Sequence, residues 1–199
     1  MATDKKRGFL FIISGPAGVG KTTLCERLVA AYPSMQRLVT TTTRPPRDGE
    51  VDGVDYHFLA EDSFQCRVID GEFIEWAKVH SNYYGSQRQH IEDVLKSGND
   101  VLLNIDVQGA RSFREKVEQA EDLDAEVVTV FIRPENIEQI KKRLIGRDSD
   151  SSDEIFRRLK TAEDELEAAD EFDHCIVSGS KEADFDAVRS IYEKHRQSG

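Results

Sequence analysis

The apolar residues of this chain occur in short runs that alternate with longer stretches of helical periodicity. Four runs share an apolar, β-branched composition: residues 9–13, 100–105, 126–132 and 175–177. Such runs are typical of strands that are buried on both faces of a sheet. After the first run, Leu24, Leu28 and Ala31 lie on one side of a predicted helix. Because strands separated by helices form right-handed crossovers, the pattern predicts an α/β fold with a parallel core sheet flanked by helices.

The middle of the chain has a different pattern. Its short strands are rich in Thr, Tyr and Val, and we expect them at 37–43, 56–59 and 73–80, with a helix at 61–69. Residues 37–85 are therefore predicted to form a mixed α/β insert, in which Trp76 is expected to be a core residue. Further helices are predicted at four places: 86–96, 134–144, 183–195 and after the capping box formed by Ser151 and Glu154.

The loop after the first strand carries the most specific motif. Gly15 to Thr22 read GPAGVGKT, which matches G-x-x-x-x-G-K-[ST] in the strand–loop–helix context that this motif requires. Its glycines let backbone N–H groups surround a phosphate, and the following helix directs its positive end at the same anion. Lys21 can reach the outer phosphates, and the Thr22 hydroxyl can bind Mg²⁺. We expect ATP to contact one continuous segment: Gly15, Pro16, Ala17, Gly18, Val19, Gly20, Lys21, Thr22 and Thr23.

Composition and charge limit the domain number, the binding partners and the cellular compartment that are expected. The chain has 199 residues, 38% of them hydrophobic and 33% charged, which suits one globular domain. A net charge of −11 argues against broad binding to nucleic acids or to an anionic membrane surface. The three cysteines are distant from one another and odd in number, which favours a reducing compartment. Because the N-terminal apolar run is too short for a signal peptide or a membrane span, a cytoplasmic enzyme is expected.

Several motifs together resemble the guanylate kinase family. Besides GPAGVGKTTL, these are TTTTRPPRDGEVDGVDY at 40–56, FIEWA at 73–77 and NYYGS at 82–86. The resemblance covers almost the whole chain. It implies a P-loop nucleoside monophosphate kinase fold and the reaction MgATP + GMP to MgADP + GDP. In such a fold the single domain 1–199 would divide into a core (about 1–36, 97–133 and 168–199), a GMP-binding region (about 37–96) and a helical lid (about 134–167).

Carried over to this sequence, the resemblance assigns the GMP site. It implies that the GMP phosphate contacts Arg44, Arg47, Tyr56 and Tyr84, and that the guanine edge contacts Thr40, Glu75 and Ser86. The chemistry agrees, because guanine presents N1–H and its 2-amino group side by side to a carboxylate such as Glu75. Adenine has the reverse pattern and would leave that carboxylate unpaired.

The lid segment supplies further cations. Ile155, Leu159, Ala162 and Leu166 follow a helical stripe, and Arg158 borders this stripe whereas Arg157 lies nearly opposite. Periodicity therefore selects Arg158 as the arginine that can point into a cleft. The resemblance implies the same residue, with Arg147 as its partner and Arg143 on ATP. The neighbouring acidic stretch 163–171 is expected to be a solvated helix face.

The chemistry implied by this family requires no general base, because a phosphate monoester has a second pKa of about 6 and is already largely ionised. We expect catalysis by positioning and by cationic stabilisation from Lys21, Arg44, Arg147, Arg158 and Mg²⁺. Thr22 is the expected direct Mg²⁺ ligand, and Asp106 the expected ligand of a metal-bound water. Closure of the insert and the lid would exclude water from the transferred group.

Two positions depart from the family pattern. Asn104, expected near the bound GMP, stands where the family often has an acidic residue, so that this position keeps an acceptor but loses a charge. Cys175 to Ser180 stand where an Asn-Asp pair often follows the last strand and borders adenine.

Three other functions are compatible with parts of the pattern. One is a guanylate-kinase-like scaffold domain that binds peptides, although such domains generally have degraded ATP sites. The second is a kinase for another small phosphorylated substrate. A GTPase is disfavoured, since no N-K-x-D guanine signature follows the fourth strand. The substrates expected are ATP and GMP, and the sequence leaves the oligomeric state open.

Overall fold

The central element is a five-stranded sheet whose neighbouring strands all pair in parallel. The structure is a computed structural model that describes residues 8–79, 81–119, 123, 125–138, 140 and 152–198, excluding the side chains of 152–158 and 198. In spatial order the strands are β2 (Met35–Arg37), β7 (Asp100–Asn104), β1 (Leu10–Ser14), β8 (Val127–Pro134) and β9 (His174–Ser178). The predicted α/β fold with a parallel core sheet is confirmed.

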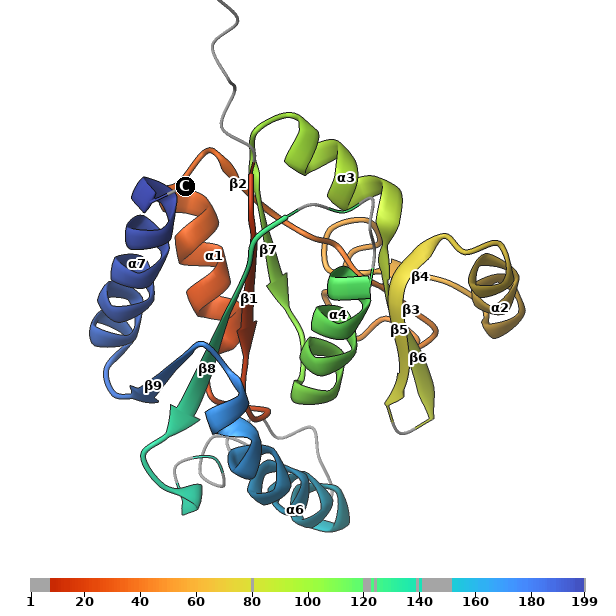
Figure 1. Cartoon of the computed structure of the whole chain (residues 1–199). Helices are drawn as coiled ribbons and strands as arrows, with labels where there is room; N and C mark the ends of the chain where they lie inside the picture. Colours follow the sequence, from red (N-terminus) through yellow and green to blue (C-terminus); the bar gives the residue numbers. More distant parts are fainter. Residues whose placement is uncertain are drawn as a thin grey trace, which may run out of the picture.

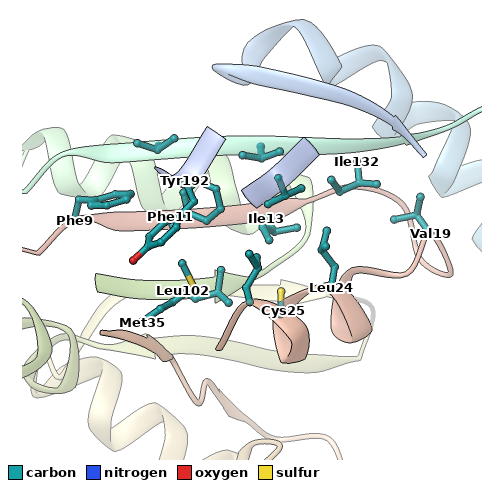
Figure 2. Close-up of a cluster of buried hydrophobic side chains, with 14 residues drawn as sticks. Phe9, Phe11, Ile13, Val19, Leu24, Cys25, Met35, Leu102, Ile132 and Tyr192 are labelled. Carbon is teal, nitrogen blue, oxygen red and sulfur yellow. The ribbon is translucent and has the colours of Figure 1, made fainter. Parts of the chain in front are cut away.

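Helices cover both faces of this sheet (Figure 1). On one face lie α1 (Lys21–Ala31) and α7 (Lys181–Ser198), and on the other lie α3 (Arg88–Lys96) and α4 (Val107–Gln119). The first strand supplies residues to both layers. Phe11 and Ile13 pack in the cluster under α1 and α7 that Figure 2 shows, whereas Leu10 and Ile12 pack in the cluster under α3 and α4. Burial on both faces explains why the sequence of β1 is continuously apolar.

A second, four-stranded sheet lies beside α4 in Figure 1. Its order is β4 (His57–Phe58), β3 (Thr41–Thr42), β6 (Asn82–Gln87) and β5 (Phe73–Val79), and α2 (Glu61–Ile69) follows β4 in the chain. Strand β5 packs against α4. This packing holds the second sheet against the core.

The C-terminal part returns across the carboxyl ends of the parallel strands. Helix α6 (Ser152–Glu167) continues into a 3₁₀ turn, η1 (Ala168–Glu171). Leu166, Ala168 and Ala169 pack against Val107 and Phe131, and Ala162 packs with Ile140. The predicted apolar stripe on this helix is therefore confirmed at Leu159, Ala162 and Leu166, while the side chain of Ile155 lies outside the described residues.

A buried carboxylate fixes the opposite, amino-terminal edge of the sheet. Asp100 has no exposed surface. Its Oδ1 accepts hydrogen bonds from the Phe9 amide (3.1 Å) and from Arg196 (2.9 Å), and its Oδ2 accepts one from the Tyr192 hydroxyl (2.7 Å). These bonds join β7, the residue before β1, and α7.

Some predictions about the elements are wrong. The expected strand 37–43 is divided, because Leu38 still bonds to Leu102 while Thr41 and Thr42 pair with the second sheet. Strand β6 was not predicted, and the helix expected from Ser86 begins at Arg88. Trp76 is 43% exposed rather than a core residue. Side chains along β5 alternate in direction, and those of its neighbours Glu75 and Ala77 are the buried ones.

Helix α4 was also missed, although its signal is present in the sequence. Its buried residues Val107, Ala110, Phe113 and Val117 follow helical spacing. The helix predicted at 134–144 is described only in part, because β8 extends to Pro134 and the segment from 141 lies outside the described residues. Ser151 and the side chain of Glu154, the predicted capping box, also lie outside them.

Candidate active site

The loop between β1 and α1 has the backbone shape that its glycines predict. Gly15, Gly18 and Gly20 have φ angles of 138°, 85° and 109°, which other residues rarely adopt. A Cβ on Gly15 would lie 2.4 Å from the Ile132 carbonyl oxygen, so that neighbouring β8 also requires glycine there. Gly20 precedes α1 and provides no side-chain cap, and the positive end of this helix is directed at the loop.

Lys21 folds back over this loop. Its Nζ donates hydrogen bonds to the carbonyl oxygens of Gly15 (2.5 Å) and Pro16 (3.1 Å). The ammonium group is therefore held at the centre of the loop. The other expected ATP contacts, from Ala17 to Thr23, follow the same turn, and Thr22 and Thr23 are exposed at its helical end.

The carboxyl end of β7 lies next to this loop. Asn104 Nδ2 is 3.4 Å from Thr22 Oγ1, although the two residues are 82 positions apart. Two residues further on, Asp106 accepts a hydrogen bond from the Gly109 amide at Oδ1 (2.7 Å) and so begins α4. This bond uses one of its two carboxylate oxygens. Hydroxyl and carboxylate oxygens are ligands that Mg²⁺ binds together with substrate phosphates and water.

A second acidic group is buried in the neighbouring sheet. Glu75 on β5 is 5% exposed, and its Oε1 accepts a hydrogen bond from the fully buried Ser86 hydroxyl on β6 (2.7 Å). The two residues face each other because an irregularity between Phe73 and Glu75 sets the register Glu75–Ser86. Burial raises the pKa of Glu75 to about 7, the Ser86 hydrogen bond opposes this rise, and Asp106 adds to it. The negative charge of Asp106, two residues beyond β7, thus acts on Glu75 in β5.

The Arg44 side chain contacts the carboxylate of Glu50 and the ring of Tyr56. Its Nη2 donates to both oxygens of Glu50 (2.8 and 2.9 Å), and its guanidinium lies 5.4 Å from the Tyr56 ring centroid. Burial would raise the pKa of Glu50, but the hydrogen bonds from Arg44 and from the Arg47 amide lower it below its ordinary value. Tyr56 packs edge-on against Tyr84, with ring centroids 6.1 Å apart. Four of the expected phosphate contacts therefore come from one loop and its neighbouring strands.

Two of the predicted GMP contacts, Thr40 and Arg47, are more exposed to solvent than Glu75 and Ser86. Thr40 is half-buried, and its carbonyl accepts the His57 amide (2.9 Å). The side chain of Arg47 is exposed, and its amide is the donor to Glu50.

The lid arginines are largely outside the described residues. Arg143 and Arg147 lie outside them entirely, and Arg158 belongs to α6 but its side chain lies outside them. Their roles therefore stay predictions.

One acidic residue was misjudged from the sequence. Glu165 in α6 was expected on a solvated face, but it is half-buried. Burial raises its pKa to about 7, Lys21 opposes this rise, and Asp106 adds to it. Glu165 thus interacts with the phosphate-loop lysine. The signal available was its place beside Ala162 and Leu166 on the buried stripe.

The departure at the last strand has a local structural role. The buried Ser178 hydroxyl donates to Asp184 Oδ2 (2.8 Å), and the Gly179 amide donates to Asp184 Oδ1 (2.7 Å). Residues 178–184 thereby form the entry into α7.

Within the described parts of the chain, no three His, Cys, Asp or Glu side chains gather into a preformed metal site. The described helices include none with the length and apolar character needed to span a membrane.

Comparison with known proteins gives consistent matches. A family model described as "Guanylate kinase" matches residues 7–195. A guanylate kinase of Geobacter metallireducens is 40% identical over 192 residues, which covers 96% of this chain and 91% of that protein. One from Rhodopseudomonas palustris is 41% identical and covers 94% and 82%. The crystal structure of guanylate kinase from Anaplasma phagocytophilum superposes with a TM-score of 0.77 at 30% identity, covering 96% of this chain and 87% of that one.

Proposed function

This chain belongs to the guanylate kinase family, and we propose that it transfers the γ-phosphate of ATP to GMP at the edge where its two sheets meet. The reaction is ATP + GMP to ADP + GDP. The observation that carries the assignment of the acceptor site is the buried Glu75, which faces Ser86 in a sheet that packs against α4.

Glu75 and Ser86 would recognise guanine. A carboxylate accepts N1–H and the 2-amino group together, and a hydroxyl from Ser86 or Thr40 can donate to O6. Adenine offers an unprotonated N1 and would leave the buried carboxylate without a partner, which is a strong basis for its rejection. The 5% exposure of Glu75 supports this role, because a buried acidic group needs a partner.

The GMP phosphate would bind Arg44, Arg47, Tyr56 and Tyr84. Arg44 Nη2 already contacts both oxygens of the Glu50 carboxylate, and a guanidinium can hold phosphate oxygens in forked geometry. Glu50 would position Arg44 from its other side, while the Tyr56 and Tyr84 hydroxyls would add neutral donors.

ATP would bind through the loop from Gly15 to Thr23, with Arg143 as a further contact. Mg²⁺ would be held by the Thr22 hydroxyl and, through a water, by Asp106, with Asn104 beside them and near the bound GMP. When bound, this ion would neutralise charge that develops on the phosphate oxygens. The Thr22 hydroxyl and the Asp106 carboxylate carry oxygen ligands of the kind that such an ion takes.

The transfer itself would rely on positioning and positive charge. A GMP phosphate oxygen forms the new bond to the γ-phosphorus as the bond to the β–γ bridging oxygen of ATP breaks, and ADP leaves with that electron pair. No residue need remove a proton, because the GMP phosphate, with a second pKa of about 6, is largely ionised at neutral pH. Lys21, Arg44, Arg147 and Arg158 would stabilise the transferred group, and Lys21 lies over its loop as this role requires.

The division of the chain follows from these roles. We propose a catalytic core (about 1–36, 97–133 and 168–199), a GMP-binding region (about 37–96) and a lid (about 134–167), whose closure would keep water from the transferred phosphoryl group. The three cysteines are free thiols, which suits a cytoplasmic enzyme. Its partners would be small nucleotides rather than nucleic acids or membranes.

Release of ADP from MgATP, measured with GMP, AMP, CMP, UMP and dTMP as acceptors, tests this proposal. Turnover restricted to GMP is expected. Lys21→Ala should abolish release with every acceptor, and the conservative Lys21→Arg serves as its matched variant. Folded wild-type protein that turns over none of the acceptors would favour a peptide-binding scaffold, and turnover with another acceptor would replace guanine as the substrate base.

A further inference from the structure

Two histidines meet at the amino-terminal edge of the core sheet, away from the nucleotide-binding edge. His174 begins β9 and His195 lies near the end of α7, so that neither belongs to the site described above. Their Nε2 atoms are 3.1 Å apart, and their rings lie at 76° with centroids 5.4 Å apart. The other ring nitrogen of His195, Nδ1, is 2.9 Å from Glu126 Oε1.

The carboxylate determines which His195 nitrogen carries a proton. Glu126 can only accept a hydrogen bond in its ionised form, so His195 donates from Nδ1. In the neutral ring this leaves a lone pair on Nε2, directed at His174.

This arrangement has the parts of a metal-binding pair. Two nitrogens bound to one tetrahedral ion at 2.0–2.1 Å lie about 3.3 Å apart. The observed separation of 3.1 Å is close to that value, so that both Nε2 atoms can bind one ion once the two rings turn their lone pairs toward it. A ligating histidine also usually donates its other N–H to a carboxylate, as His195 does to Glu126.

We propose that His174 and His195 form a binding site for a divalent transition-metal ion, with Glu126 as the group that orients His195. Imidazole pairs suit Zn²⁺, Cu²⁺ or Ni²⁺, whereas Mg²⁺ prefers oxygen donors and is not bound there. Water completes the coordination. The ion joins the outermost strand of the sheet to α7 and stabilises their contact, independently of the phosphoryl-transfer reaction.

The site is accessible to an ion in solution. The side chains of His195 and Glu126 are 25% and 50% exposed, and His174 is half-buried. His174 can bind the ion through Nε2 in the tautomer that carries its proton on Nδ1, and metal binding then replaces the hydrogen bond between the two rings.

Calorimetric titration of the chelator-treated protein with ZnCl₂ alone, and with MgCl₂, tests the proposal. One Zn²⁺ per chain is expected, with no Mg²⁺ binding at this site in the absence of nucleotide. The melting temperature should rise by about 2–4 °C at free Zn²⁺ about five times the dissociation constant. His174→Gln and His195→Gln should each lose this binding and this shift, whereas the matched control His90→Gln, on α3, should keep both.

Glu126→Gln keeps both metal ligands and tests the orienting carboxylate. Its Zn²⁺ affinity should fall by about 10-fold or more. Cu²⁺ added to the wild-type protein should give an electron paramagnetic resonance spectrum with coupling to two imidazoles, and to one or none in either histidine variant. Equal Zn²⁺ binding by wild type and by the double variant His174→Gln/His195→Gln would overturn the proposal, as would the absence of any Zn²⁺-dependent shift in the wild type.

Discussion

Ser86 donates its buried hydroxyl to Glu75 Oε1 over 2.7 Å, across the pair of strands β5 and β6. Among the influences of the described residues on the pKa of Glu75, this bond favours the ionised carboxylate, whereas burial and Asp106 both raise the pKa. The free protein therefore keeps a carboxylate where its charge is unfavourable. A guanine base would supply the two donors that this carboxylate lacks.

Glu75→Gln should increase the stability of the free protein at alkaline pH. The folded-state pKa of about 7 lies above the ordinary 4.5, so the folded chain loses stability as pH rises between these two values. Above pH 7 the whole penalty is present. The variant should gain on the order of 2–3 kcal/mol in free energy of unfolding at pH 8 and almost nothing at pH 4. Urea denaturation at both values measures this, and an equal effect at both would contradict it.

The same pKa predicts how GMP binding depends on pH. Recognition needs the ionised Glu75, which is about one-tenth populated one pH unit below its pKa of about 7. The KM for GMP should therefore rise about 10-fold between pH 8 and pH 6, while the KM for ATP changes little. Glu75→Gln is the control, because ionisation of the GMP phosphate affects both proteins. Parallel profiles for the two proteins would remove Glu75 from the explanation.

Glu50→Gln tests whether Glu50 positions Arg44. The substitution removes the charge that Arg44 contacts at 2.8 and 2.9 Å, so the guanidinium should lose its fixed orientation. The KM for GMP should rise about 10-fold with a smaller change in kcat, because a charge-assisted hydrogen bond contributes about 1.5–3 kcal/mol. Steady-state kinetics of Asp48→Asn, which removes a carboxylate charge from the same loop, provides the control and should leave this KM nearly unchanged. A lower KM would instead mean that Glu50 competes with the GMP phosphate.

Asp100→Ala should destabilise the fold without altering the site. It leaves Arg196 and the Tyr192 hydroxyl without their shared buried acceptor. Because the Arg196 side chain is 28% exposed, loss of its buried partner should cost about 2–3 kcal/mol, less than in a fully buried pair. Tyr192→Phe, which removes the bond to Asp100 and the longer contact with Ser34, should cost about 1 kcal/mol. Urea denaturation measures both, and kcat/KM at a temperature where each variant is folded should match the wild type. A changed KM would connect this edge of the sheet to the site.

The sequence predicted those parts of the site that local patterns encode. The phosphate loop could be predicted because its glycines, lysine and threonine have fixed spacing between a strand and a helix. The proposed guanine contacts Glu75 and Ser86 were predicted from family motifs, and their burial could not be derived from alternation alone. Once the register Glu75–Ser86 is known, the alternation of β5 explains why Glu75 is buried and Trp76 is exposed.

The errors arose where tertiary pairing overrides local preference. Residues 37–43 have β propensity throughout, but the chain crosses between two sheets there, and propensity does not reveal which sheet a residue joins. Glu165 lies in an acidic stretch that composition assigns to solvent. Only the packing of α6 on the core brings it near Lys21.

The most direct test of the guanine assignment compares GMP with IMP, which keeps N1–H and O6 but lacks the 2-amino group. Wild-type protein should prefer GMP by about 10- to 100-fold in kcat/KM, because IMP leaves part of the Glu75 carboxylate unpaired. In Glu75→Gln, GMP turnover should fall sharply and the preference should shrink to about 3-fold or less. A variant that keeps the wild-type ratio and turns over GMP normally would show that Glu75 does not read the base.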